Sequence, residues 1–393
     1  MGKKEFHTAS FEDVKSGKVT DVYFDRTMEI LKAKGIDKRV KMEFRAKKLP
    51  KDWEWGILAG MEECVRLLAG ERVSVRCLPE GSLFRAFDPV MELEGMYTDF
   101  GVFETALLGL ICQSSGIATM AARCKMAAGE RKVISFGARR MHPAISPMIE
   151  RSAFIGGCDG VAVVKSAELI EEKPVGTMPH ALILIMGDSV AATKAFHEVV
   201  DPTINRVALV DTLGDEKFEA LGCAESIGKD LFAVRLDTPG SRKGNFKQIF
   251  EEVRWELDLR GYSHVKLFAS GGIDEQAIKE LNPVVDAYGV GTSISAAHVI
   301  DFSLDIMEIE GEPLAKRGKM SGSKSLLRCG GCLKSLIVPY RGRERNCGCG
   351  NIMTDILSPL IRDGSSVKDL DKAAKIRESV LKQINRINKK VGD

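Results

Sequence analysis

The sequence has few of the features that mark an exported, membrane-bound or nucleic-acid-binding protein. Its 57 basic residues nearly balance 55 acidic ones, so the net charge of +2 requires no polyanionic partner. Residues 1–7 lack the apolar core of a signal peptide, and Phe6 stands where N-myristoylation of Gly2 requires Ser or Thr. No apolar run approaches the roughly 20 residues that cross a bilayer. We therefore expect a cytoplasmic protein without a membrane or nucleic-acid partner.

The chain also lacks the cysteine pattern of a secreted disulfide framework. Of its ten cysteines, six are scattered among ordinary apolar residues. The other four lie near the C-terminus as Cys-X-X-Cys followed, after 14 residues, by Cys-X-Cys. This arrangement fits a reducing compartment and one metal site better than disulfide pairing. The clustered residues are Cys329, Cys332, Cys347 and Cys349.

Four thiolates with this spacing can close a tetrahedral zinc site, and the flanking glycines permit the tight turns of a knuckle. We expect a structural Zn²⁺, because four thiolates leave no open coordination position for a substrate. An iron–sulfur cluster and disulfide pairs are the alternatives. The charged amphipathic helix expected over 367–390 is interpreted as a solvated face.

At 393 residues the chain is long enough for two or three domains with buried cores. Residues 40–46 and 72–78 alternate in polarity as half-buried strands do, and 57–68 has helical apolar spacing. From about residue 132 the pattern repeats strand, loop and helix. The strand-like runs are 133–136, 160–164, 206–211, 231–237, 265–269 and 285–290, with a further short strand expected before His180.

The spacing of these runs leaves room for a crossover helix each time and predicts a parallel sheet. Six or seven such units fit a closed or partly closed βα barrel, and a doubly wound open sheet is the rival. Polar and glycine motifs follow nearly every strand, which favours the barrel, because barrel enzymes build active sites on that face. These motifs are 137–142, 177–180, 211–212, 235–238, 270–274 and 289–293.

Two of the motifs carry groups suited to anion binding and catalysis. Arg139 and Arg140 follow a strand, and a guanidinium fork matches carboxylate and phosphate oxygens. His180 lies in a turn shaped by glycine and proline, so it is a candidate acid, base or nucleophile. A surface arginine pair and a loop histidine are the plainer interpretation. His142, directly after the arginines, fits a structural hydrogen bond equally well.

Two glycine motifs follow the last two strands of the repeating region. Gly271 and Gly272 in the first, and Gly291 with Thr292 in the second, can present backbone amides to a phosphate. Tight turns without a ligand are the alternative.

Arg235 and Asp237 place opposite charges on one side of a strand end. The aspartate suits ribose hydroxyls or a phosphate-associated Mg²⁺, whereas a buried ion pair that only fixes geometry is the alternative. Tyr23, near the N-terminus, is either a core side chain or a cover for a flat ring.

Together the motifs resemble nicotinate phosphoribosyltransferase of the archaeal type, which carries a C-terminal cysteine knuckle. The resemblance runs over nearly the whole chain and rests on seven motifs in order. They are 20–23, 136–140, 156–160, 176–180, 235–237, 270–272 and 291–292.

The resemblance implies the type II phosphoribosyltransferase fold, an α/β sandwich domain plus an irregular βα barrel. Residues 1–115, completed by about 296–326, would form the sandwich, and 116–295 the barrel with the active site. Residues 327–393 would form a zinc-ribbon-like module and a C-terminal helix. A homo-oligomer with active sites shared between subunits is implied as well.

The resemblance also implies an activity. Nicotinate and phosphoribosyl pyrophosphate would give nicotinate mononucleotide and pyrophosphate in NAD biosynthesis, with ATP and Mg²⁺ as cofactors and His180 as a phosphohistidine. Phe136 and a neighbouring subunit's Tyr23 would sandwich the pyridine ring, and Asp237 would lie near the ribose. The other implied substrate contacts are Arg139, Thr177 and Arg235 around the carboxylate, Arg140 beside them, and Gly271, Gly272, Gly291 and Thr292 at the 5′-phosphate. Looser candidates for pyrophosphate or ATP phosphates are Lys316, Lys319 and Lys324.

One position departs from the family pattern. Ala181 follows His180, where many relatives have glutamate, so the group that orients the imidazole is not identified. Three rival functions stay open. Quinolinate phosphoribosyltransferase shares the fold without using ATP, a flavin-binding barrel oxidoreductase also holds phosphate on glycine loops, and a zinc-ribbon adaptor would use the barrel only as scaffold.

Overall fold

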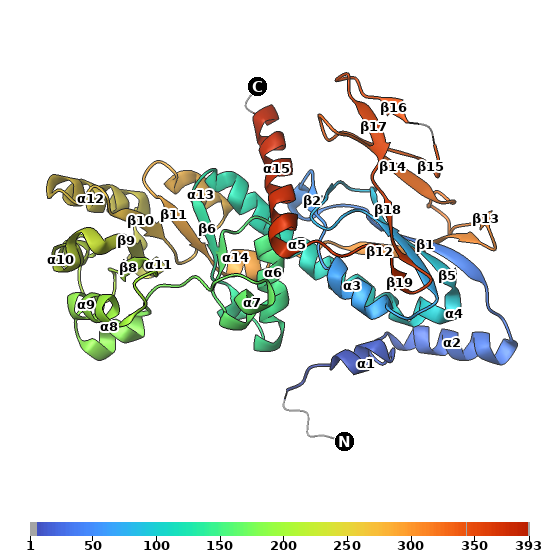
Figure 1. Cartoon of the computed structure of the whole chain (residues 1–393), viewed down its shortest axis with the longest axis horizontal. Coiled ribbons are helices and arrows are strands. Elements are labelled where there is room, and N and C mark those ends of the chain that lie inside the picture. The colour runs from blue at the N-terminus through green and yellow to red at the C-terminus, as the bar shows by residue number, and fades with distance from the viewer. Residues whose placement is uncertain (1–5, 343, 392–393) are drawn as a thin grey trace. The chain divides into compact units, whose positions relative to one another are not determined.

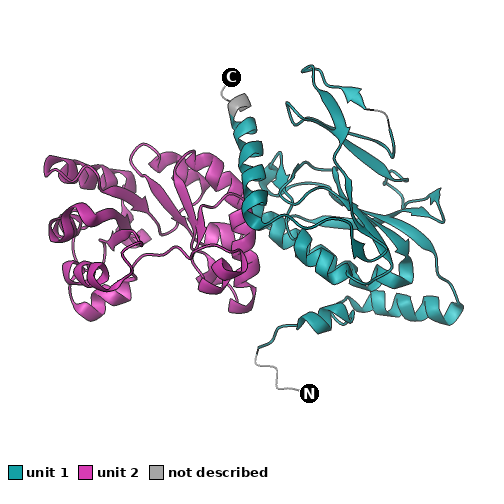
Figure 2. Cartoon of the chain, in the orientation of Figure 1, with its two compact units in different colours: residues 1–119, 298–393 teal, residues 120–297 magenta. Residues whose placement is uncertain are grey.

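The structure, a computed structural model, describes residues 6–342 and 344–391. The chain divides into two compact units (Figure 2): residues 1–119 with 298–393 form unit 1, and residues 120–297 form unit 2. Unit 1 is therefore drawn from two separated stretches of sequence, and unit 2 is one continuous stretch (Figure 1).

Unit 1 is built on a seven-stranded sheet with the order β13-β12-β1-β5-β3-β18-β19. The strand expected over 40–46 is confirmed as β1 (Arg39–Ala46), which pairs antiparallel with β5 (Pro89–Met96) and β12 (Phe302–Ile309). In β3 (Val73–Cys77) buried and half-buried residues alternate, as the sequence predicts. The remaining strands are β13 (Glu312–Pro313), β18 (Ser358–Arg362) and β19 (Ser365–Ser366), and β2 (Gly56–Ile57) pairs separately with β4 (Leu83–Phe84).

The helix expected within 57–68 is confirmed as α3 (Met61–Leu68). Its apolar spacing buries Met61, Cys64, Leu67 and Leu68, so one face of the helix lies in the core. The other helices that begin in unit 1 are α1 (Phe11–Lys15), α2 (Val22–Lys34), η1 (Pro50–Asp52), α4 (Tyr97–Phe100), η2 (Gly101–Phe103), α5 (Glu104–Ala128) and α15 (Ala373–Val391).

The stretch Tyr97–Ala128 is long and apolar enough, by length and composition alone, to cross a membrane. The sequence predicts that residues 99–128 are mostly helical, and this stretch confirms it. Its most apolar window is 61% buried inside the protein, and the Ser115 and Thr119 hydroxyls accept hydrogen bonds from the Ala59 and Ile57 amides at 3.0 and 2.8 Å. The core helix of a soluble protein can have the same length and apolar composition, because apolar residues are favoured inside a protein core as they are in a membrane.

The cysteine segment forms a separate four-stranded sheet with the order β15-β14-β17-β16. The chain then returns to the large sheet, where β18 pairs antiparallel with β3. Helix α15 is more than a solvated face, because Ile376, Val380 and Ile384 are buried, and Gln383 Nε2 donates to Gly81 O at 2.9 Å. The strands of the small sheet are β14 (Lys324–Cys329), β15 (Ser335–Pro339), β16 (Arg345–Asn346) and β17 (Ile352–Asp355).

Unit 2 contains a six-stranded parallel sheet with the order β7-β6-β11-β10-β9-β8. Strands β6 and β7 pair, β8 to β11 pair in chain order, and β11 returns beside β6. The consecutive strands β7 and β8 do not pair and form the two edges, so the sheet is a partly closed barrel. The parallel sheet and the α/β fold class are as the sequence predicts. The strands are β6 (Lys132–Ser135), β7 (Gly160–Val161), β8 (Arg206–Leu209), β9 (Leu231–Leu236), β10 (Lys266–Ala269) and β11 (Ala287–Val290).

The short strand expected before His180 does not form. Residues 172–179 run between the two edge strands without regular structure, and the Val175 amide donates to Val161 O at 2.8 Å. The helices of unit 2 are η3 (Ala138–Arg140), η4 (Pro143–Ile145), α6 (Ser146–Ile155), α7 (Val164–Leu169), α8 (His180–Met186), α9 (Ser189–Val199), α10 (Glu216–Ile227), η5 (Gly228–Asp230), α11 (Gly240–Lys243), α12 (Phe246–Leu259), α13 (Glu275–Leu281) and α14 (Thr292–Ser295).

Candidate active site at the strand ends of unit 2

His180 is the first residue of α8. Its Nδ1 lies 2.9 Å from Thr212 Oγ1, a hydrogen bond whose direction depends on the ring tautomer. Two carboxylates flank the ring at longer range, with Asp211 Oδ1 3.9 Å from Nδ1 and Asp237 Oδ2 3.6 Å from Nε2. The imidazole is 39% exposed, so a ligand can reach it from solvent.

Asp211 joins the ends of β8 and β9 beside this histidine. Its Oδ2 accepts hydrogen bonds from the Asp237 amide and, at 3.3 Å, from the Thr238 hydroxyl. Burial raises the pKa of the Asp211 carboxyl, and the Asp237 amide and the His180 ring oppose that rise. Asp211 and Thr212 appeared in the sequence only as one of several strand-end motifs, and nothing local marked either as a partner of His180.

Arg235 and Asp237 are opposite charges at the end of β9, with Arg235 Nη2 4.0 Å from Asp237 Oδ2. Nη2 also donates to Met178 O at 3.3 Å, which ties β9 to the segment that precedes α8. The guanidinium carbon lies 5.9 Å from the centre of the Phe136 ring, within cation–π range. Burial lowers the pKa of Arg235, the two aspartates oppose this, and the nearby charge of Arg139 lowers it further.

Phe136 follows β6, and its amide donates to Val290 O at 2.9 Å. The ring lies across β11, because a Cβ added to Gly289 would come 2.4 Å from a ring carbon. Only glycine at that position leaves room for the ring. Phe136 is half-buried and packs 5.9 Å from the Phe268 ring, centre to centre. It therefore offers an apolar surface next to the Arg235 guanidinium.

The loop after β10 has the conformation of a glycine turn. Gly271 and Gly272 have φ angles of +77° and +67°, where other residues are strained. A Cβ on Gly271 would lie 2.6 Å from Asp237 Oδ1, so this loop packs directly against Asp237. Lys243 Nζ donates to Gly271 O, and burial lowers the Lys243 pKa while Asp237 opposes the shift. The sequence analysis missed Lys243, whose one signal was a basic turn after a strand.

The second glycine motif lies at the end of β11. A Cβ on Gly137 would come 2.6 Å from Gly291 O, so the loops after β6 and β11 approach closely. Gly291 O accepts hydrogen bonds from the Ile294 and Ser295 amides, at 3.0 and 3.2 Å, and Thr292 is exposed. The two glycine loops and the Phe136 loop thus lie together at the carboxyl ends of the strands.

The other predicted site residues are Arg139, Arg140, Thr177 and Tyr23. Arg139 and Arg140 are exposed in η3, and Thr177 Oγ1 lies 3.4 Å from Met178 O. Tyr23 belongs to unit 1, where it is 57% exposed.

His142 has a structural position, because its Nδ1 accepts from the Ala144 amide at 3.2 Å and caps η4. This contact is the kind of structural hydrogen bond that the sequence analysis considered for that histidine.

The lysines named as looser phosphate candidates belong to unit 1, and two of them are committed to ion pairs. Lys324 Nζ lies 2.9 Å from Glu43 Oε2, and their side chains are 6% and 2% exposed. Lys319 is 3% exposed and pairs with Asp305. A buried ammonium needs its carboxylate partner, so neither lysine is available to a phosphate. Lys316, at 68% exposure, contacts Asp305 at 2.6 Å and stays accessible.

The four clustered cysteines bring their sulfur atoms within 4.8 Å of one another. Cys329 Sγ lies 3.3 Å from Cys349 Sγ, and Cys332 Sγ lies 3.5 Å from Cys347 Sγ. Tetrahedral zinc with bonds of about 2.3 Å separates its sulfur ligands by about 3.8 Å. The donor set and its spacing therefore fit a zinc ion.

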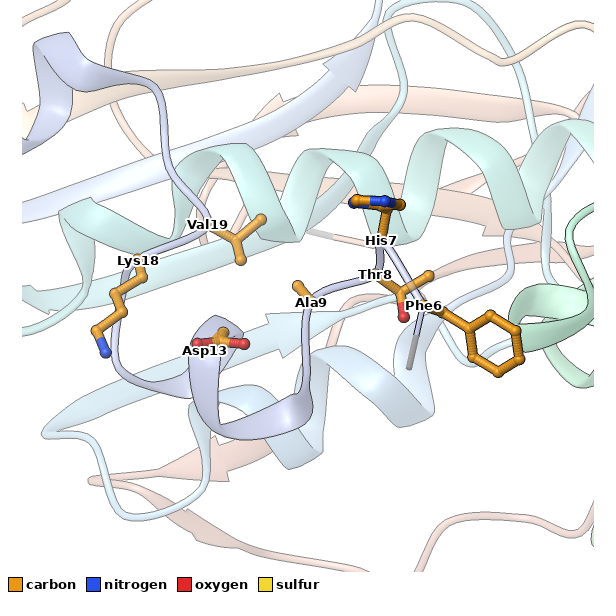
Figure 3. A pocket seen from close by; sticks show the side chains of 7 residues that line it. All are labelled: Phe6, His7, Thr8, Ala9, Asp13, Lys18 and Val19. Carbon is orange, nitrogen blue, oxygen red and sulfur yellow. The ribbon is translucent and has the colours of Figure 1, made fainter. Parts of the chain in front are cut away.

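Figure 3 shows a hollow of a different kind, formed by the N-terminal residues of unit 1. The strand-end residues described above do not line it. Its lining residues are Phe6, His7, Thr8, Ala9, Asp13, Lys18 and Val19.

Family models match most of the chain in two parts. The N-terminal domain of quinolinate phosphoribosyl transferase matches residues 21–115, and the C-terminal domain of the same family matches residues 117–305. With the partly closed barrel and its glycine loops, these matches define the class as a phosphoribosyltransferase of the type II fold.

Individual relatives show which family of this class the chain belongs to. A crystal structure from Pyrococcus furiosus, described as nicotinate-nucleotide pyrophosphorylase, is 53% identical with a TM-score of 0.96, covering 98% of this chain and 99% of that one. A nicotinate phosphoribosyltransferase of Mycobacterium tuberculosis is 30% identical over 332 residues, 78% of this chain and 67% of the relative. The chain belongs to the nicotinate phosphoribosyltransferase family. Human nicotinic acid phosphoribosyltransferase, at 19% identity and a TM-score of 0.74 over 93% of this chain and 94% of its own, shares the fold.

Proposed function

We propose that the protein is a nicotinate phosphoribosyltransferase that forms nicotinate mononucleotide and pyrophosphate from nicotinate and phosphoribosyl pyrophosphate, for NAD biosynthesis. One observation carries the proposal. A half-buried aromatic ring beside a guanidinium, a glycine turn packed on an aspartate, and a solvent-accessible histidine all meet at one edge of the sheet. The names of the relatives point to the same activity.

Recognition of the acid rests on Phe136 and Arg235. Nicotinate is flat and anionic, so it suits an apolar ring with a guanidinium 5.9 Å away. Arg139 adds a second positive charge that acts on Arg235, and Thr177 lies one residue before the Met178 carbonyl that Arg235 holds. Tyr23 is exposed in unit 1, and we propose that a neighbouring subunit supplies it to the other face of the pyridine ring.

The phosphoribosyl group is placed by the glycine turns. The amides of Gly271 and Gly272 would hold the 5′-phosphate together with Gly291 and Thr292, and Lys243 lies against the same turn. The bond between ribose C1 and the pyrophosphate oxygen breaks as the pyridine nitrogen bonds to C1. That nitrogen is already nucleophilic, so the site has to align the groups rather than remove a proton.

Asp237 would carry two tasks at this step. Its carboxylate is 29% exposed and 4.0 Å from Arg235 Nη2, so it can face the ribose and the developing positive charge on C1. A Mg²⁺ ion bound with the pyrophosphate would use the same carboxylate as an oxygen ligand and would neutralise charge on the leaving group.

We also propose that ATP phosphorylates His180. Phosphorylation adds about 1.5 to 2 negative charges at neutral pH, next to the Asp237 carboxylate at 3.6 Å. Repulsion between them would shift Asp237 and the connection that carries His180, and so alter the affinity for phosphoribosyl pyrophosphate. The cysteine cluster, by contrast, would hold a structural Zn²⁺, since all four donors are thiols and the module belongs to unit 1.

The decisive test is nicotinate mononucleotide synthesis with and without ATP, in wild type, His180→Ala and His197→Ala. His197 is a matched control, since it is a partly exposed histidine of the same unit whose Nε2 lies 3.8 Å from a carboxylate, that of Asp230. ATP should stimulate wild type and His197→Ala and leave His180→Ala unaffected. Failure of wild type to use nicotinate under any condition would refute the assignment.

Quinolinate phosphoribosyltransferase stays the second candidate, because both matching family models carry that name. It would release carbon dioxide from quinolinate without ATP, and the contacts around His180 would then have no task. Quinolinate supplied in place of nicotinate should give no nucleotide and no carbon dioxide, and turnover of quinolinate alone would establish the rival.

A further inference from the structure

We infer that Thr212 is the positioning residue of His180, and that it holds the imidazole with its proton on Nδ1 and its lone pair on Nε2. The inference rests on the proposed function of His180 as a phosphoryl acceptor. It also supplies an orienting group for the imidazole, which the sequence analysis left unidentified.

Distances single out Thr212 among the neighbours of the ring. Its Oγ1 lies 2.9 Å from Nδ1, which is a normal hydrogen-bond length. The carboxylate oxygens of Asp211 and Asp237 lie 3.9 and 3.6 Å from the ring nitrogens, beyond that length. Within residues 6–342 and 344–391, the threonine hydroxyl is therefore the side-chain group that bonds directly to the imidazole.

Asp211 is occupied in another way. Its Oδ2 accepts from the Asp237 amide and the Thr238 hydroxyl, so this oxygen fastens β8 to β9. Its Oδ1 is buried with no hydrogen-bond partner in the described structure, and the side chain is 1% exposed. Asp211 thus acts on the ring through its charge and not through a hydrogen bond.

A threonine hydroxyl can either donate or accept, so the charge of Asp211 sets the direction of this hydrogen bond, and the bond then stabilises that tautomer. The unpartnered Asp211 oxygen lies on the Nδ1 side and favours a proton there. On the Nε2 side, the charge of Asp237 is offset by Lys243 and by Arg235 at 4.0 Å, and Arg235 acts more strongly on Asp237 than on Asp211. The proton therefore resides on Nδ1, where the Thr212 hydroxyl accepts it.

This arrangement leaves Nε2 ready to react. The Nε2 lone pair attacks the γ-phosphorus of ATP, the bond from that phosphorus to the β,γ-bridging oxygen breaks, and ADP departs with the bonding electrons. Nδ1 keeps its proton, so the phosphorylated ring carries a positive charge, which the Asp211 carboxylate 3.9 Å from Nδ1 stabilises. Thr212 holds the ring plane by the same hydrogen bond before and after the transfer.

The tautomer can be measured without any turnover. In protein labelled with ¹⁵N-histidine, two-bond ¹H–¹⁵N spectra report the protonated nitrogen of each ring, and His180→Ala assigns the signal among the six histidines of the chain. We expect the Nδ1–H form in wild type and in Thr212→Ser, which keeps the hydroxyl. Thr212→Val, which keeps the shape, should gain the Nε2–H form. An Nε2–H ring in wild type, or an unchanged ring in Thr212→Val, would overturn the inference.

Phosphorylation gives a second measure. With γ-labelled ATP, Thr212→Val should form the Nε2-phosphorylated enzyme about tenfold more slowly than wild type, the effect of one hydrogen bond to a reacting group, and Thr212→Ser should stay within about threefold. Equal rates for the valine and serine variants would count against Thr212. A wild type that takes up no label would defeat the ATP coupling instead, and the spectra would still decide the role of Thr212.

Discussion

Removal of Lys324 should destabilise unit 1 without weakening phosphate binding. Lys324 and Glu43 are buried and 2.9 Å apart, so Lys324→Met leaves a carboxylate in the core without its principal counter-charge. Breaking a buried pair costs about 3–5 kcal/mol. Arg45 Nε lies 3.8 Å from the other Glu43 oxygen and offsets part of the loss, which favours the lower end, about 3 kcal/mol.

Urea unfolding followed by tryptophan fluorescence measures this cost, because Trp53 and Trp55 are buried in unit 1 and Trp255 of unit 2 is exposed. Lys324→Met combined with Glu43→Leu should recover most of the lost stability, since no buried charge then lacks a partner. The exposed pair Lys382–Glu378 serves as control, and Lys382→Met should leave the midpoint unchanged.

The loss should also depend on pH. Burial raises the pKa of Glu43 above its ordinary 4.5, and Lys324 and Arg45 oppose that rise. Without the lysine the folded-state pKa rises further. A carboxyl with a raised folded-state pKa stabilises the fold below its unfolded value and loses that contribution as pH increases through the folded value. The deficit of Lys324→Met should therefore grow from about pH 4.5 toward neutrality. A pH-independent deficit, or a raised KM for phosphoribosyl pyrophosphate with intact stability, would refute the reasoning.

Three further changes test the site and the module. Gly271→Ala should lower the free energy of unfolding by about 1–2 kcal/mol through its positive φ and should also lower kcat by displacing Asp237. Gly261→Ala, with φ of +81° and open space around it, should lower stability alone. Equal kcat in both variants would contradict this. Arg235→Lys should reduce the transition-state stabilisation measured by kcat/KM for nicotinate by about 2 kcal/mol, because one ammonium replaces a planar fork. An unchanged kcat/KM would remove Arg235 from acid recognition. Cys329→Ser, or stripping the metal with a chelator, should lower the first unfolding midpoint together with zinc content measured by elemental analysis, and a stoichiometric loss of zinc without any shift would show that the module is independent.

Much of the fold and part of the site follow from local sequence patterns. Repeated apolar runs predicted the parallel strands of unit 2, and glycine or charged residues after them marked the edge where Phe136, Arg235 and Gly271 lie together. The four cysteines were equally visible, since ligand type and spacing are local properties.

What escaped prediction depends on long-range pairing. Thr212 is an ordinary residue until α8 brings His180 within 2.9 Å of it, and Lys324 looked like a loop cation until Glu43, 281 positions away, proved to be its partner. Likewise, no local pattern shows that β18 returns to pair with β3. Such contacts depend on partners distant in sequence, which periodicity does not encode.

The open side of the barrel has a consequence for how the enzyme would respond to its ligands. Strands inside the sheet are fixed by ladders on two sides, whereas residues 172–179 run without regular structure before His180, joined by bonds such as those from the Val175 amide and Arg235. A charge added to His180 should therefore displace the weakly held residues 172–179 and leave the six strands in place. Amide exchange should accordingly be faster in this connection than in the six strands, and phosphorylation should change its rate more than that of any strand.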